Sequence, residues 1–171
     1  MNKIGDVGFK ALAMSENYPT LAALKLDMNK IQEEGVKQMG LICNLQRLEV
    51  LKMRSNAIES KGALFLCQSF AVQHLLVLDV SQNNIGDEGF KHITSASFLS
   101  NLHKLYANDN QLTMQAAQHL IDSKFIFKLR VLALGKNQLQ EKGVQLLADA
   151  FNLYELTHLI INDNDIKEEG A

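Results

Sequence analysis

The sequence has few of the residues that mark several large protein classes. It contains two cysteines, one proline and no tryptophan in 171 residues. Two cysteines are too few for a disulfide framework, and neither Cys43 nor Cys67 stands in a C-x-x-C motif, so we expect a reducing, cytoplasmic compartment. No run of 18 apolar residues and no signal-peptide pattern is present, and we therefore expect no membrane partner.

Charge of one sign is not in excess either. There are 17 Lys and Arg against 19 Asp and Glu, for a net charge of −2. A chain without a basic excess is not drawn to nucleic acid, so no nucleic-acid partner is expected. Pro19 is the single proline, and no Gly/Ser-rich stretch divides the chain. Residues 1–171 are therefore predicted to form one domain.

The minimal motifs of common enzymes are also missing. The sequence has no G-x-S-x-G, G-x-x-x-x-G-K-[ST], G-x-G-x-x-G or H-E-x-x-H, so we predict a non-enzymatic protein without a cofactor. His92 and His119 occupy the same helical column in adjacent units. Neighbouring helices would hold them roughly 10 Å apart. That separation is too large to share a metal ion, and no metal site is predicted.

What the sequence has is an internal repeat of 27 residues. Asparagine recurs at this interval seven times, with isoleucine or leucine two residues later each time. The column consists of Asn2, Asn29, Asn56, Asn83, Asn110, Asn137 and Asn164. Leucine stands eight residues before each of the last six, and glycine six residues after all but one, where Ala116 replaces it. Such regularity indicates a stacked array of similar units.

Each unit reads L-x-x-L-x-L-x-x-N-x-[IL]-x-x-x-G. The L-x-L step has the two-residue period of a short strand. After the glycine the period lengthens, as at Phe90 and Ile93, which predicts one apolar face of a helix. Acidic residues at the expected helix starts, such as Asp87 and Glu88, are interpreted as caps on these helices rather than as metal ligands.

This pattern resembles the leucine-rich repeat family, and its 27-residue strand-and-helix unit resembles the ribonuclease-inhibitor-like subclass. The resemblance covers the whole chain. It implies an α/β fold, a right-handed solenoid or horseshoe with parallel strands on the concave face and helices on the convex face. It also implies that the asparagines form a ladder of hydrogen bonds to backbone groups in the turns.

The two ends of the array depart from the full unit. The chain opens with a half repeat, whose helix carries Phe9, Leu12 and Met14 and is expected to cover the first core face. About six units follow, and the last stops before its helix. We expect the open C-terminal repeat to self-associate or to fray, because it leaves a strand edge and leucines bare. A fragment of a longer repeat protein would explain the same ending.

Function is assigned to strand residues that point away from the core, because they vary from unit to unit while the core columns are uniform. Cross-strand pairs Asp27–Arg54 and Lys52–Asp79 are expected, whereas Lys25 beside Lys52 leaves a basic patch. Tyrosine and arginine are enriched at binding hot spots. The predicted partner-binding residues are Lys25, Asp27, Met28, Lys52, Arg54, Asp79, Tyr106, Asn108 and Asp109.

We therefore predict a protein–protein interaction module that binds a protein partner through the concave sheet. The low cysteine content favours a cytosolic adaptor, or a bacterial effector acting in the host cytosol, over a cysteine-rich inhibitor. An alternative from another class is a regulator of a small GTPase, as Ran activators are. A scaffold fragment without a function of its own is the third interpretation.

Overall fold

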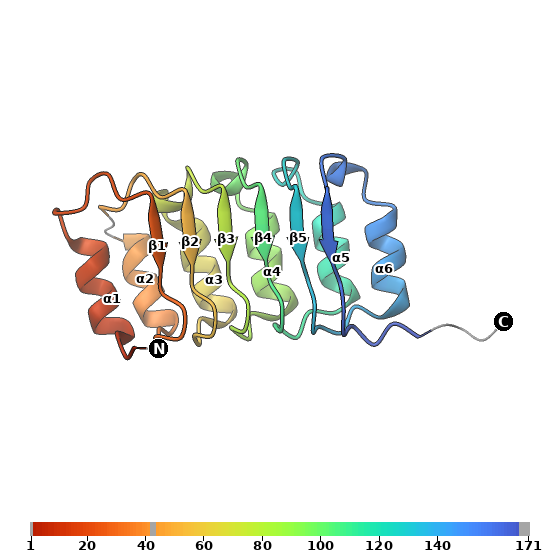
Figure 1. Cartoon of the computed structure of the whole chain (residues 1–171), viewed down its shortest axis with the longest axis horizontal. Coiled ribbons are helices and arrows are strands. Elements are labelled where there is room, and N and C mark those ends of the chain that lie inside the picture. Colours follow the sequence, from red (N-terminus) through yellow and green to blue (C-terminus); the bar gives the residue numbers. More distant parts are fainter. Residues whose placement is uncertain (1, 42–43, 168–171) are drawn as a thin grey trace.

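The computed structural model describes residues 2–41 and 44–167 as a solenoid of alternating strands and helices (Figure 1). Each of the first five strands is followed by a turn, an α-helix and a return loop, and three of the described return loops contain a 3₁₀ turn. The elements are α1 Gly5–Met14, β1 Ala23–Lys25, α2 Glu33–Leu41, β2 Val50–Lys52, α3 Glu59–Gln68, η1 Phe70–Val72, β3 Val77–Asp79, α4 Gly86–Thr94, η2 Ser97–Leu99, β4 Lys104–Tyr106, α5 Met114–Ile121, β5 Val131–Ala133, α6 Gln140–Ala148, η3 Phe151–Leu153 and β6 His158–Ile160.

The strands form one parallel sheet in chain order from β1 to β6. The register follows the repeat, since Leu24 pairs with Leu51 and Leu51 with Leu78. Figure 1 shows the helices side by side behind this sheet. The predicted α/β leucine-rich-repeat architecture is therefore confirmed.

The core lies between the sheet and the helices. The central residue of each interior strand is fully buried, as Leu78 and Leu105 are, and so are Phe90 and Ile93 of α4. Each unit can bury these side chains only against its neighbours, so stacking creates the core.

The glycine column marks the place where neighbouring helices approach most closely. A Cβ atom on Gly89 of α4 would lie 3.1 Å from Cα of Ser60 in α3 and 2.8 Å from Cβ of Ile85. Side chains are excluded from this column for lack of space, since both contacts are closer than carbon atoms normally pack. At the exception, Ala116, the methyl group is fully buried.

The asparagine ladder is present in every described turn from Asn56 onward. Oδ1 of Asn137 accepts hydrogen bonds from the backbone N–H of Asn110 and of Leu112, at 2.9 and 3.0 Å. Nδ2 of Asn137 donates to the carbonyl oxygens of Ala107, Leu134 and Gly135. Each side chain thus completes the turn of the preceding repeat, where backbone groups would otherwise be buried without partners.

At the first turn the ladder is incomplete. Nδ2 of Asn29 donates to the carbonyl oxygen of Asp27 at 3.0 Å. Its Oδ1 is buried and has no partner among the residues that the structure describes.

The acidic residues at the helix starts act differently from the prediction. Asp87 does not cap its own helix: α4 has no side-chain cap, and Oδ1 of Asp87 accepts from the backbone N–H of Thr113 at 2.8 Å. Asp6 accepts from the N–H of Gln32 at 2.7 Å in the same way. Both carboxylates, which stand in the first turn of their own helices, therefore tie one repeat to the next.

The half repeat at the N-terminal end covers only part of the core face. Phe9 of α1 is buried, whereas Met14 is exposed and does not join the core as predicted. Leu12, Leu21 and Leu24 are half-buried and line an apolar cavity of about 170 Å³. The helix side of this end is covered, and the strand side is open.

At the other end, β6 pairs with β5 on one side only. Leu159 is 43% exposed, whereas the equivalent Leu132 of β5 is fully buried. The expectation of an open core face at this repeat is confirmed for the residues described there.

Candidate partner-binding face

The side of the sheet that faces away from the helices carries four of the nine predicted partner-binding residues, and the other five follow the ends of strands β1, β2 and β4. The middle residue of each strand points into the core, so the first and third point to this opposite side. In β3, for example, Leu78 is fully buried and both Val77 and Asp79 are partly exposed. We call this surface the sheet face; it comprises Ala23, Lys25, Val50, Lys52, Val77, Asp79, Lys104, Tyr106, Val131, Ala133, His158 and Ile160.

The first residues of the strands were missing from the predicted site. Val50, Val77 and Val131 are half-buried on the sheet face. They belong to a column beside the predicted one, in which Lys104 separates Val77 from Val131. The alternation that directed Lys52 and Asp79 outward applies equally to residues two positions earlier. That signal was sufficient to find them, but valine in a strand is readily taken for core.

Lys25 and Lys52 lie directly opposite one another in the register of β1 and β2. The predicted pair between Lys52 and Asp79 is wrong: no ion pair joins them, and Oδ1 of Asp79 accepts from the backbone N–H of Ser81 at 3.0 Å. In the described ranges, the ion pairs present lie on helices or join Arg130 to Glu155. Neither lysine is therefore neutralised by a neighbouring carboxylate.

The predicted pair between Asp27 and Arg54 is also wrong in kind. Oδ1 of Asp27 accepts from the backbone N–H of Arg54 at 2.9 Å rather than from its guanidinium. Nε of Arg54 instead donates to Oε1 of Gln82 at 3.0 Å. The carboxylate of Asp27 is engaged in holding adjacent strand ends together.

Asn108 has the same role further along the sheet. Its Oδ1 accepts from the N–H of Gly135 at 2.8 Å, and its own N–H donates to Oγ of Ser81 at 3.2 Å. These bonds form a second ladder beside the asparagine column. A Cβ atom on Gly135 would lie 2.7 Å from Oδ1 of Asn162, so glycine makes room for the ladder. The side-chain oxygens of Asp27 and Asn108 thus hold adjacent repeats together, and this is a structural role more than a partner-binding one.

The corner after each strand is built from residues in the left-handed backbone region. Met28, Ser55, Gln82, Asp109, Lys136 and Asp163 have φ between 54° and 58°. Gln82 connects three of these corners, because its Oε1 accepts from Oγ of Ser55 and its Nε2 donates to Oδ2 of Asp109 at 3.1 Å. Asp109 is thereby engaged within the protein.

Met28 and Tyr106 are the predicted residues that present apolar surface. Met28 is 45% exposed and lines an open hollow of about 450 Å³ with Ala57 and Lys30. Tyr106 is half-buried at the centre of the sheet face, and its hydroxyl makes no hydrogen bond within the described part of the chain. Lys25, Lys52, Tyr106 and Met28 are therefore the predicted residues with free side chains.

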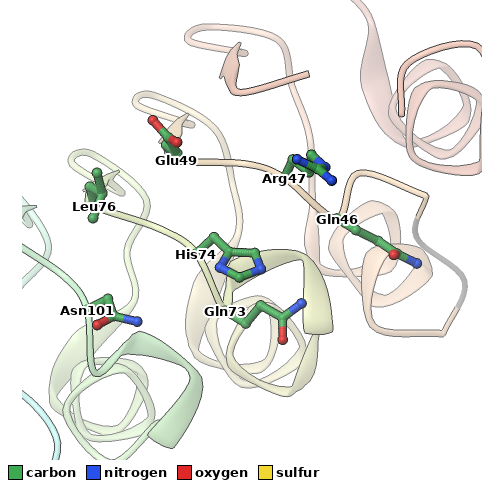
Figure 2. Close-up of a pocket in the computed structure, with 7 residues that line it drawn as sticks. All are labelled: Gln46, Arg47, Glu49, Gln73, His74, Leu76 and Asn101. Carbon is green, nitrogen blue, oxygen red and sulfur yellow. The ribbon is translucent and has the colours of Figure 1, made fainter. Parts of the chain in front are cut away.

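A second hollow, of about 640 Å³, lies along the loops that lead into the strands. Figure 2 shows Glu49 and Leu76 beside the strand ends and Gln46 and Gln73 beside helices seen end-on. Arg47, His74 and Asn101 complete its lining. No hydrogen bond joins any two of these seven side chains, so no reactive group is activated by a neighbour. The sheet face remains the better-defined site.

Comparison with protein-family models supports the repeat assignment. The model described as Leucine Rich repeat matches residues 44–67, 73–93, 126–148 and 156–171. The chain has the fold of a leucine-rich-repeat solenoid. Comparison of the sequence with curated proteins gives no match.

Cys67 of this leucine-rich-repeat solenoid is a buried residue of α3, whereas Cys43 is outside the described residues. Burial raises the pKa of the Cys67 thiol from 9.0 to about 12. The thiol is therefore protonated at neutral pH and is a poor nucleophile. Within residues 2–41 and 44–167, no three His, Cys, Asp or Glu side chains gather as metal ligands would, and none of the helices has the length and apolar character to cross a bilayer.

Proposed function

We propose that this leucine-rich-repeat solenoid binds a protein partner through its sheet face. Leucine-rich repeats are generally protein–protein interaction modules. One observation carries the assignment to this face: the middle strand residues repeat as leucine, while the flanking residues vary and several have free side chains. A rigid scaffold that holds varied side chains in fixed columns suits recognition.

Within the sheet face, Lys25, Lys52 and Tyr106 are proposed as the principal contacts. Their polar atoms are not occupied by other side chains, and tyrosine is enriched among residues that dominate binding energy. Asp27, Asp79, Asn108 and Asp109 are proposed to contribute mainly by holding the surface rigid, because each accepts a hydrogen bond from within the protein. Arg54 is held by Gln82 and Met28 extends the surface at the corner.

The proposal has three further parts. The repeats are of the ribonuclease-inhibitor-like subclass, the protein is not an enzyme, and it acts as a cytosolic adaptor or as a bacterial effector in the host cytosol. The 27-residue unit and the low cysteine content support this proposal. A GTP hydrolysis assay with a panel of small GTPases separates this role from that of a GTPase regulator, because a pure binder leaves turnover unchanged.

Binding is tested with a partner first isolated by crosslinking and then purified. Tyr106→Ala and the double variant Lys25→Ala/Lys52→Ala should each raise the Kd at least about fivefold, which corresponds to roughly 1 kcal/mol. His92→Ala on α4 is the control, since its ring lies on the helix side near Glu88. Equal affinity of all variants for the partner would contradict the proposal and would place the binding site on the helices or loops.

We further propose that this solenoid self-associates through β6. Within residues 2–41 and 44–167 no strand pairs with the outer edge of β6, and Leu159 and Ile160 are exposed. Hydrogen exchange of amides 156–161 should show protection that increases with protein concentration, in parallel with dimers in sedimentation. Protection equal to that of amides 75–80 at every concentration, in a monomer, would contradict this.

A further inference from the structure

The sheet face changes in character from one end to the other. On β1 and β2 it carries Lys25, Lys52 and the nearby Arg54, against the single carboxylate of Asp27. On β5 and β6 it carries the half-buried Val131, the exposed His158 and Ile160, which is 41% exposed, whereas Ala133 is buried. Tyr106 on β4 lies between the two ends. A partner that covers the whole face must match both ends.

The basic end has an unbalanced arrangement. Lys25 and Lys52 are directly opposite one another on adjacent strands, where like charges destabilise a sheet. Asp79 is the next residue in this column, but its Oδ1 accepts from the N–H of Ser81. An anionic group placed over the two ammonium groups would relieve their repulsion.

The backbone of the sheet restricts the conformation of the partner. Strands β2 to β5 are paired on both sides, so their peptide groups offer no free hydrogen bonds to a chain that lies across them. A partner segment crossing the face must satisfy its own backbone groups, and a helix does this along its entire length. An extended segment would gain no backbone hydrogen bonds from the sheet.

We propose that the sheet face binds an amphipathic helix of the protein partner, with acidic residues over Lys25 and Lys52 and apolar residues over Tyr106 and Ile160. This inference rests on the proposed function. Adjacent strands are about 4.8 Å apart, so β2 and β6 are separated by about 19 Å. At 1.5 Å per residue, the helix residue over Lys52 lies about 6 positions from the one over Tyr106 and about 13 positions from the one over Ile160.

The experiment uses a phage-displayed library of single helices with randomised surface positions, selected on the full chain. Affinities of selected peptides are then measured for the parent, for Tyr106→Ala and for Lys25→Glu/Lys52→Glu. The matched control is Lys61→Glu/Lys142→Glu, two lysines on α3 and α6. Circular dichroism and thermal melting establish that every variant is folded.

The expected result is selection of peptides with Asp or Glu at one end and apolar residues at the other. Lys25→Glu/Lys52→Glu should weaken them at least about tenfold, and the control double variant less than about twofold. Peptides with lysine in place of the acidic residues should prefer the Lys25→Glu/Lys52→Glu protein. Raising the salt from about 50 to 500 mM should weaken the acidic peptides, because exposed charges are screened.

The other outcomes separate the two proposals. Peptides that lose affinity with Tyr106→Ala, but show no acidic enrichment and no response to Lys25→Glu/Lys52→Glu, would overturn the acidic-helix inference and leave the sheet-face function standing. Peptides that respond to neither variant would overturn both.

Discussion

The asparagine ladder allows a prediction in which the number of hydrogen bonds sets the loss of stability. Asn137→Ala removes the acceptor of two buried N–H groups, those of Asn110 and Leu112. Of the three carbonyl oxygens that lose Nδ2, those of Leu134 and Gly135 keep other donors, Nδ2 of Asn164 and N–H of Asp109. The carbonyl oxygen of Ala107 loses its partner, which costs less than leaving a buried N–H without one. The orphaned donors therefore dominate. At about 1–3 kcal/mol each, the free energy of unfolding should fall by about 2–6 kcal/mol.

Two other members of the column serve as graded controls. Oδ1 of Asn164 accepts from a single N–H, that of Leu139 at 3.2 Å, so Asn164→Ala should cost about 1–3 kcal/mol. Oδ1 of Asn29 has no partner in the described structure, so Asn29→Ala should cost less than about 1 kcal/mol.

The assay is urea unfolding followed by circular dichroism at 25 °C. With an m-value of about 2 kcal/mol per M, Asn137→Ala should lower the midpoint by about 1–3 M. The order Asn137, Asn164, Asn29 is the essential result. Equal midpoint shifts for all three would refute the reasoning, because the residue type and column are the same and only the bonds differ.

Two further predictions concern packing and burial. Gly89→Ala should destabilise the protein by about 1–2 kcal/mol in the same assay, because overpacking against Ile85 and Ser60 exceeds the gain in helix propensity; a stabilised variant would show that α3 and α4 can separate freely. The Cys67 thiol has a pKa of 9.0 in the unfolded chain, and burial raises this pKa to about 12 in the folded one. The contribution of the protonated thiol to the free energy of unfolding is therefore complete below pH 9 and is lost as the pH rises toward 12. Between pH 8 and 10 the parent should lose about 1 kcal/mol more than Cys67→Ala, and identical pH profiles would contradict this assignment.

The repeat period alone makes the architecture predictable. A spacing of 27 residues places Leu51 beside Leu78, and this register is observed. The core columns can be predicted from the sequence equally well, since an apolar residue that recurs in every unit has to be buried by stacking. The ends are harder, as the exposed Met14 shows, because a side chain there lacks the neighbour that buries it in other repeats.

The polar side chains of the sheet face were harder to predict. Asp27 and Arg54 were correctly expected to be neighbours, but the carboxylate accepts from the backbone N–H and not from the guanidinium. Column positions specify which residues are close, whereas rotamers and competing acceptors such as Gln82 decide which atoms bond. Charge complementarity between columns therefore predicts proximity better than it predicts ion pairs.

The ladder also has a direction along the chain, and this affects synthesis. Oδ1 of each interior asparagine accepts from backbone groups of the repeat before it, as Asn137 does from Asn110 and Leu112. A turn that has emerged from the ribosome therefore lacks this hydrogen-bond acceptor until the asparagine 27 residues later has been synthesised. At about 5–20 residues per second, that delay is about 1–5 s. During translation, the folded part of this chain should trail the newest residues by one whole repeat.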